Sequence, residues 1–334
     1  MKEFRTVRGF EEVWRPPSGA RRVRLEAPGP SWWAGYDLRE RLARLARGAP
    51  EVVVKVTGRT RDPVHLRSHL EYLTRNGQLV VLTRNGVEVC GRQEVRELAE
   101  GWSAVDLLDP RRRANSPMSV GVVLSMPRRT DPLRLTAAAA AFAEQAFEGH
   151  DYVLVLHTDA DHPHVHVAVR ARGDDGRRLN PRKADLEAWR QMFAQALRDR
   201  GVDAEATPRR ARGVTRKAER TPLRKIRERF EAGAGPLPAR LRSALVDAAG
   251  AMGGGAGLEA WDRAIQARQQ VVRRLYLAQA RLLQASEDPG DRRLGRDVER
   301  FVREMPAPDS RRLVLARALR AAQERAAARQ GMER

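Results

Sequence analysis

The chain has 334 residues, enough for about two domains with cores of their own. Lys and Arg total 63 against 43 Asp and Glu, a formal net charge of +20, and 42% of the residues are hydrophobic. These values exclude a disordered chain and favour a polyanionic partner such as nucleic acid. The single cysteine, Cys90, excludes a disulfide framework and a cysteine-based zinc site. No apolar run is long enough to span a bilayer, and the first residues lack the apolar stretch of a signal peptide. We therefore expect a soluble protein of a reducing compartment.

In chain order, residues 1–50 are predicted to form a basic N-terminal arm with one helix, capped by Asp37 and ended by Gly48. Residues 51–205 then mix strand and helix patterns without strict βαβ alternation. Strands are expected at 51–56, 120–126, 152–159 and 164–172, a hairpin at 78–90 around Asn85-Gly86, and helices at 64–75, 93–104, 132–147 and from Asn180-Pro181 to 200. This mixture predicts an α+β domain with a central, largely antiparallel sheet flanked by helices.

The strand patterns stop after residue 205. Residues 206–257 are predicted to be a basic and Gly-rich linker, because the stretch from 206 to 229 carries ten cations against two anions and a Gly-rich break covers 250–257. Helical patterns follow at 258–286, 291–304 and 310–329. We therefore expect residues 258–334 to form a helical C-terminal region.

Four of the seven histidines lie within ten residues, in His157-Thr-Asp-Ala-Asp-His-Pro-His-Val-His166. If this segment is a hairpin, side-chain alternation puts His157 on one face of its first strand and His164 and His166 on one face of the second. Three imidazoles converging from adjacent strands are typical of a divalent-metal site with open positions. The alternative is a set of core histidines or a chance surface cluster. His162 lies in the turn, where metal contact and exposure both stay open, and Asp159 is expected to orient a metal-bound imidazole.

A metal site in a polycationic protein indicates phosphoryl chemistry, which needs a nucleophile. Of the four tyrosines, Tyr72 lies near the end of the helix after the first strand, beside Arg75. A tyrosine oxygen can attack phosphorus, although its pKa near 10 makes it weak unless a metal neutralises the attacked phosphate. Taken alone, the position of Tyr72 favours a residue of an amphipathic helix. Arg75, Arg170 and Arg172 lie close to these motifs and are candidate phosphate contacts, although a solvated surface role fits each of them as well.

The histidine motif, His157-x-Asp-x-x-His-Pro-His-x-His166, resembles the third motif of conjugative relaxases, the HUH-type single-strand DNA nickases. The segment Leu70-Glu-Tyr-Leu-Thr-Arg-Asn-Gly77 resembles the nucleophile motif of the branch that includes the T-DNA border nickase of Agrobacterium. The strand 120–125 followed by Met126-Pro127 is similar to that branch's serine motif. Together the resemblance covers about residues 50–218, and it assigns no role to the N-terminal arm or to the helical end.

This resemblance implies roles for particular residues. Tyr72 would attack the scissile phosphodiester and become linked to the 5′ end of the DNA, and the released 3′-hydroxyl could reseal the strand by the reverse reaction. His157, His164 and His166 would hold Mg²⁺ or Mn²⁺. Asp159 would orient a ligand or help to take the tyrosine proton, and Ser125 would position the DNA.

The resemblance also implies a setting: nicking at an origin of transfer for conjugation or mobilization, with single-stranded DNA, relaxosome accessory proteins and a type IV secretion coupling protein as partners. Such a protein is cytoplasmic and can be carried with the DNA into a recipient cell. Two alternatives remain. A rolling-circle replication initiator of the same superfamily is disfavoured because the tyrosine motif precedes the histidine motif. A non-enzymatic, basic DNA-binding accessory protein would use the histidines for a structural zinc.

Overall fold

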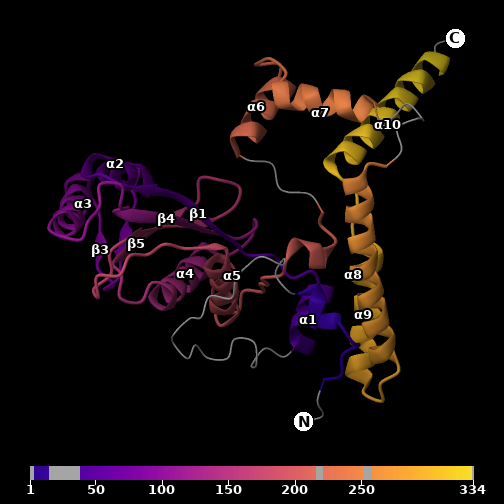
Figure 1. The fold of residues 1–334 in the computed structure, drawn as a ribbon, viewed down its shortest axis with the longest axis horizontal. Helices are drawn as coiled ribbons and strands as arrows, with labels where there is room; N and C mark the ends of the chain where they lie inside the picture. The colour runs from indigo at the N-terminus through magenta and orange to yellow at the C-terminus, as the bar shows by residue number, and fades with distance from the viewer. Residues whose placement is uncertain (1–3, 15–37, 216–220, 251–257, 333–334) are drawn as a thin grey trace. The chain divides into compact units, whose positions relative to one another are not determined.

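The computed structural model describes residues 4–14, 38–215, 221–250 and 258–332. It divides the chain into two compact units, one of residues 16–206 and the other of residues 1–15 with 207–334 (Figure 1). Among the described residues, no helix combines the length and the apolar character needed to cross a bilayer.

A six-stranded sheet forms the centre of the unit 16–206, with strand order β1-β4-β6-β5-β2-β3 and every pairing antiparallel. This arrangement confirms the predicted α+β class. The strands are β1 (Val53–Thr60), β2 (Val81–Thr83), β3 (Glu88–Val89), β4 (Ser119–Ser125), β5 (Tyr152–His157) and β6 (His164–Arg170). The hairpin expected around Asn85-Gly86 is formed by β2 and β3, where Gly86 has a φ of 76°.

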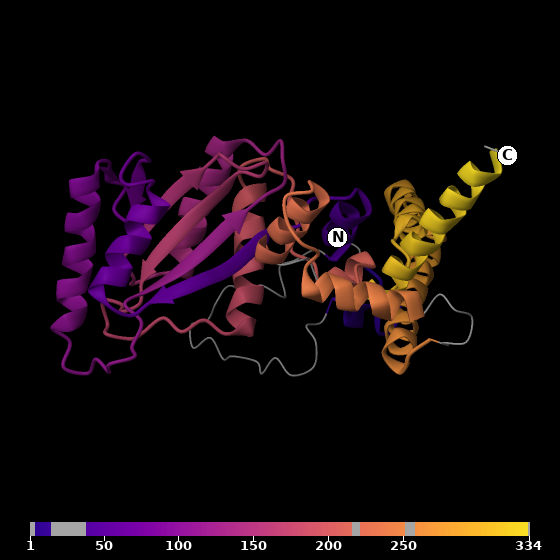
Figure 2. The same cartoon turned by 90° about the horizontal axis from the view of Figure 1, so that it is seen from above.

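Helices cover both faces of the sheet. One face packs against α4 (Pro132–Ala146) and α5 (Lys183–Arg198), and the other against α2 (Pro63–Leu73) and α3 (Arg92–Leu107) (Figures 1 and 2). The alternation along β6 explains this, because Val165, Val167 and Val169 enter the α4–α5 core while Ala168 enters the α2–α3 core. Each helix pair thus packs against one face of β6. His164 and His166 lie on the same face of β6 as Ala168.

The helix predicted in the N-terminal arm is present as α1 (Leu38–Ala46), but it belongs to the same unit as the sheet. Its Arg41 and Arg44 pair with the fully buried carboxylate of Glu205, at 3.3 Å and 2.9 Å. A buried charge requires such partners, so this pairing ties α1 to the end of the domain. The expected boundary at residue 50 therefore differs from the observed division. Asp37, the expected cap of this helix, lies outside the described residues.

The unit of residues 1–15 and 207–334 is helical where it is described. It contains the short 3₁₀ turns η1 (Phe10–Val13) and η2 (Arg209–Arg212) and the helices α6 (Thr221–Glu231), α7 (Ala239–Gly250), α8 (Ala260–Gln284), α9 (Pro289–Glu304) and α10 (Arg311–Met332). α8 and α9 pack closely enough that a Cβ on Gly295 would lie 2.7 Å from the Ala280 carbonyl oxygen. Phe10 and Trp14 pack edge-on against Tyr276, with ring centroids 5.6 Å and 6.1 Å away.

Two expectations differ from this structure. The segment 206–257, predicted as a linker, contains η2, α6 and α7. In α6 the apolar residues Leu223, Ile226 and Phe230 are spaced for one helix face, and the surrounding cations hid this pattern. The helix expected to open at Asn180-Pro181 instead begins at Lys183, where the Asp185 carboxylate accepts a hydrogen bond from the Arg182 backbone N–H at 2.6 Å. Helices do occupy the predicted C-terminal region.

Candidate metal centre and active site

The three histidines predicted as metal ligands lie together at one end of β5 and β6. His157 is directly opposite His164 in the register, and His166 is opposite Val155. The ring centroids are 4.5–5.2 Å apart, and one nitrogen from each ring lies within 4.8 Å of the others. Three imidazole nitrogens at this spacing can converge on one divalent cation and leave further positions for a phosphate oxygen or water.

Backbone carbonyls fix the orientation of two of these rings. His157 Nε2 donates to the Leu73 carbonyl oxygen at 2.7 Å, which leaves Nδ1 as its ligand atom. His164 Nδ1 lies 3.0 Å from the His162 carbonyl oxygen and leaves Nε2. Hydrogen bonding of the second ring nitrogen is the usual way in which a protein sets the tautomer of a metal ligand.

The electrostatics of the cluster also suit a cation. Burial lowers the pKa of the His157 imidazole below its ordinary value. For His166, burial and the nearby His157 and His164 lower the pKa to about 3. Both rings are therefore neutral at pH 7, the form that binds metal. The donor set and its protonation state fit a divalent ion.

Sequence reasoning missed His69, which lies three residues before Tyr72 on α2. Its ring packs over β4 at Gly121, where a Cβ would lie 3.2 Å from His69 Cε1 and 2.7 Å from Thr57 Oγ1. His69 is also close enough to lower the pKa of His166. The only indication of His69 in the sequence was its helical spacing from Tyr72. Its contact with β4 joins residues far apart in the chain, so no local pattern predicts it.

Tyr72 is exposed rather than part of the core, with 64% of its surface accessible. The next residue, Leu73, supplies the carbonyl that holds His157. The last turn of α2 is therefore fastened to the histidine cluster. Tyr72 lies off the buried face of α2, which consists of Leu66, Leu70 and Leu73.

Arg75 and Asp159 connect Tyr72 with the cluster. The Arg75 guanidinium carbon is 5.9 Å from the centre of the Tyr72 ring, and the same side chain forms an ion pair with Asp159. The second carboxylate oxygen of Asp159 lies 4.0 Å from His157 Nδ1. Desolvation raises the pKa of Asp159, but the Arg75 charge and a backbone hydrogen bond outweigh it and lower the pKa overall, so Asp159 is a carboxylate at pH 7.

The backbone after α2 is unusual and aims Arg75 back towards Tyr72. Arg75, Asn76 and Gly77 have successive φ values of 53°, 57° and 82°. Thr74 Oγ1 accepts from the Gly77 N–H at 3.0 Å, and a Cβ on Gly77 would lie 2.3 Å from the Gly91 carbonyl carbon. Non-glycine residues in the left-handed region cost free energy and concentrate at functional sites.

Ser125 ends β4 directly opposite His164, and its hydroxyl lies 3.4 Å from the Pro163 carbonyl oxygen. The structure therefore brings Ser125 to the same end of the sheet as the histidines. His162 lies outside the group of three, and its Nδ1 accepts from the Arg128 backbone N–H at 3.2 Å.

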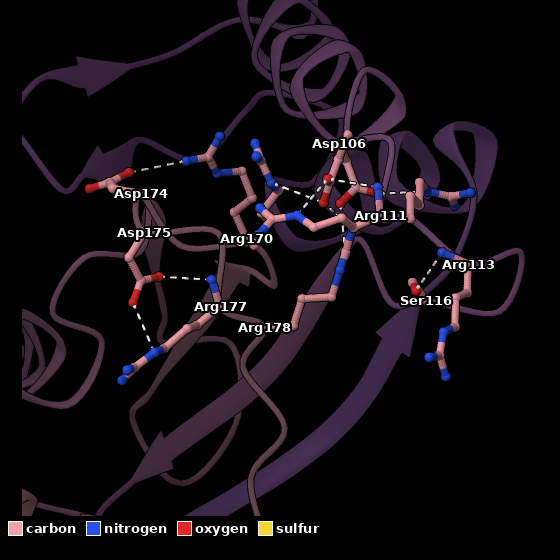
Figure 3. A network of polar contacts seen from close by, with 12 residues as sticks. Asp106, Arg111, Arg113, Ser116, Arg170, Asp174, Asp175, Arg177 and Arg178 are labelled. Carbon is pink, nitrogen blue, oxygen red and sulfur yellow. Dashed lines mark hydrogen bonds and ion pairs between the residues drawn. The ribbon is translucent and has the colours of Figure 1, made fainter. Parts of the chain in front are cut away.

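Arg170 ends β6 on the side away from the histidines and is held in ion pairs (Figure 3), and Arg172 follows two residues later. Arg170 is buried and contacts Asp151 at 2.9 Å and Asp174 at 3.3 Å. Arg172 contacts Asp109 at 3.1 Å. DNA contact by these two arginines stays a prediction that this placement does not favour.

Around Asp109 lies a set that we term the buried arginine network. Asp106 accepts from Arg112 at 2.7 Å and Arg178 at 2.8 Å, and Arg178 also reaches Asp109 at 3.2 Å. Both carboxylates are almost fully buried. The members of the network are Asp106, Asp109, Arg112, Arg172 and Arg178.

Residues 72–202 match the family model of the relaxase MobA/VirD2-like nuclease domain. The matched segment begins at Tyr72 and contains Ser125, Asp159 and all three clustered histidines. The resemblance to relaxases that the motifs predicted is thereby confirmed.

The T-DNA border endonucleases VirD2 of Agrobacterium fabrum, Rhizobium radiobacter and Rhizobium rhizogenes are each 26% identical to this chain. The first aligns over 206 residues, 53% of this chain and 46% of the relative, and the other two over 49% of this chain and 43% and 42% of theirs. The chain thus spans less than half the length of these relatives. The MobM relaxase domain bound to 26-nucleotide pMV158 oriT DNA superposes with a TM-score of 0.38 and 13% identity, over 52% of this chain and 98% of its own.

Proposed function

We propose that this chain is a DNA relaxase that nicks one strand by transesterification, with Tyr72 as the nucleophile. The observation that carries the proposal is the series of contacts from the Tyr72 ring through Arg75 and Asp159 to His157 Nδ1. It joins an exposed phenol to the histidine cluster, and all of these residues lie within the segment that matches the relaxase model.

In the proposed reaction the phenolate oxygen of Tyr72 attacks the scissile phosphorus and the bond from phosphorus to the 3′ oxygen breaks. We infer that Asp159, which pairs with Arg75 and is charged at pH 7, takes the phenol proton. The departing 3′ oxygen gains a proton, and the DNA stays attached through a 5′-phosphotyrosyl diester. The diester keeps the energy of the broken bond, so the 3′-hydroxyl reseals the strand by the reverse step.

His157, His164 and His166 would hold the divalent cation, Mg²⁺ or Mn²⁺ in this proposal. When bound, such an ion supplies neutralisation of charge on the attacked phosphate. The protein contributes fixed tautomers at His157 and His164, a cation at Arg75 and a hydroxyl at Ser125 on the same end of the sheet. We infer that Arg75 and Ser125 contact the DNA backbone.

The match to the relaxase family model and the similarity to the VirD2 endonucleases support a setting for this activity. We propose that the chain nicks DNA in the cytoplasm, at an origin of transfer for conjugation or mobilization. The protein can then be carried with the attached DNA into a recipient cell. Relaxosome accessory proteins and a type IV secretion coupling protein are the partners that this proposal implies. The net charge of +20 suits a single-stranded DNA substrate whose affinity falls steeply with salt.

The test is covalent capture. The wild-type chain is incubated with single-stranded oligonucleotides of randomised sequence and Mn²⁺, then denatured and separated on a gel. We expect a labelled adduct that is lost in Tyr72→Phe and in excess chelator, whereas Tyr72→Phe still retards DNA on a native gel. An adduct that persists in Tyr72→Phe would contradict the assigned nucleophile, and binding without any wild-type adduct would leave only a DNA-binding protein.

A further inference from the structure

We propose that the outer side of α2 carries a subsite for one nucleotide next to the scissile phosphodiester, with its phosphate between Arg92 and Arg96 and its base beside Asn76. The proposal rests on the nicking activity proposed above and adds to it a determinant of base preference. Three features of the described residues carry it.

The first feature is a shallow hollow of about 270 Å³ lined by Ser68, Glu71, Tyr72, Arg75 and Asn76. Small-molecule sites begin at roughly 300 Å³, so the hollow suits a single nucleotide rather than a longer stretch. Because Tyr72 is part of its wall, a group seated there adjoins the phosphorus that the phenol attacks. Tyr72 and Arg75 also offer planar faces on which a base can stack.

The second feature is a pair of arginines held by one carboxylate. Glu71 accepts from Arg96 Nε at 2.7 Å and from Arg92 Nε at 3.4 Å. The hydrogen bond from Arg96 is the main cause of a lowered pKa of Glu71, which therefore stays charged. The terminal guanidinium nitrogens of both arginines have no partner among the described residues, and the side chains are 57% and 36% exposed. Two oriented guanidinium groups with free N–H bonds match a phosphate.

The third feature is Asn76, whose backbone N–H donates to the Glu71 carbonyl at 2.7 Å. Its side-chain amide is exposed and has no partner within the part of the chain that the structure describes. The turn is anchored to the start of α3, since the Gly91 N–H donates to the Gly77 carbonyl at 3.0 Å. An amide offers a donor and an acceptor side by side, the pairing that a base edge presents.

Asparagine also tolerates a positive φ, so the turn by itself would account for this residue. Asn76→Gly separates the two roles, because glycine keeps the left-handed turn and removes only the amide. For the phosphate, Arg92→Gln with Arg96→Gln removes both charges. Arg113→Gln is a matched control: this arginine is exposed in the same unit, and its side chain has no partner among the described residues (Figure 3).

The experiment first sequences the strands captured by the wild-type chain from a randomised single-stranded library with Mn²⁺. Synthetic oligonucleotides then carry each of the four bases at the two positions flanking the mapped nick, and initial rates of adduct formation are compared. We expect the wild type to prefer one base at one of these positions by roughly tenfold, the discrimination typical of one amide–base pair. Asn76→Gly should lose this preference and keep the wild-type melting temperature.

The double arginine variant should need more DNA for half-maximal rate and keep the rate at saturation. Its binding should also show a salt slope smaller by about 0.7, which corresponds to one phosphate contact on a single strand. Arg113→Gln should match the wild type. If the wild type forms adducts but the base preference of Asn76→Gly or the salt slope of the double variant is unchanged, the subsite is wrong while nicking stands. If the wild type forms no adduct, both proposals fail.

Discussion

Two groups of arginines in the unit 16–206 differ in how much of each guanidinium group is paired with a carboxylate. In the buried arginine network, Arg112, Arg172 and Arg178 direct their charge at the almost fully buried Asp106 and Asp109. Beside Tyr72, Arg92 and Arg96 share one carboxylate through their ε nitrogens and expose the rest. The number of arginines therefore does not locate a phosphate-binding surface in this chain. The carboxylates that meet each guanidinium decide whether it is available.

The largest expected effect lies in the buried network. Asp106→Asn removes one of the two almost fully buried carboxylates and leaves the partly buried Arg112 and Arg178 without this partner, which should lower the free energy of unfolding by about 3 kcal/mol. Glu71→Gln is the matched change at the exposed pair, where about 1 kcal/mol or less is expected. Urea unfolding of both variants checks this comparison. Equal losses in the two variants would show that burial does not separate the two groups.

The stability contributed by the histidine cluster and that contributed by the carboxylates should be lost in different pH ranges during acid unfolding. The pKa of His166 is lowered to about 3 in the folded state, against an ordinary value of 6.5. The unfolded chain therefore takes up a proton first, and the stability present above pH 6.5 is lost as the pH falls from 6.5 towards 3. Asp109 has a lowered pKa, mainly through the Arg111 backbone hydrogen bond, so its contribution is present above its ordinary value of 3.8 and is lost at lower pH.

The check is to measure unfolding by urea from pH 7 to pH 3, in excess chelator, for the wild type and His166→Gln. The glutamine variant should show a shallower fall in stability between pH 6.5 and pH 4, with the loss below pH 3.8 preserved. Parallel curves for the two proteins over the whole range would contradict the assignment of this window to His166.

The smallest expected effect concerns the ion pair between Arg75 and Asp159, which lies between Tyr72 and the histidine cluster. Asp159→Asn releases Arg75 from its partner and should tighten DNA binding at low salt by about threefold, the scale of one exposed ion pair. Adduct formation should slow, because the group placed to take the Tyr72 proton is gone. Fluorescence anisotropy and single-turnover capture measure the two quantities. Weaker binding in Asp159→Asn would overturn the competition between Asp159 and DNA for Arg75.

Sequence reasoning succeeded where the relevant contacts are local. The alternation of valine and histidine along β6, and the turn that pairs it with β5, are enough to bring His157, His164 and His166 together. The antiparallel sheet follows from similar alternation and from the Asn85-Gly86 turn. These features depend on neighbours that the sequence itself places side by side.

It failed where partners are distant along the chain. Arg172 forms an ion pair with Asp109, and Arg178 with Asp106, across more than sixty residues of chain. No local pattern therefore shows that these arginines are already paired. The same applies to the ion pairs between α1 and Glu205 and to the packing of His69 over Gly121. In α6, a run of cations concealed the helical spacing of the apolar residues.

The central claim is that the Tyr72 oxygen forms the bond to DNA. Wild-type protein is incubated with single-stranded DNA from the captured library and Mn²⁺, digested with protease and nuclease, and analysed by tandem mass spectrometry. The account predicts a nucleotide mass on the peptide that contains Tyr72, localised to the tyrosine. A nucleotide on Tyr36, Tyr152 or Tyr276, or on a histidine of the cluster, would contradict it.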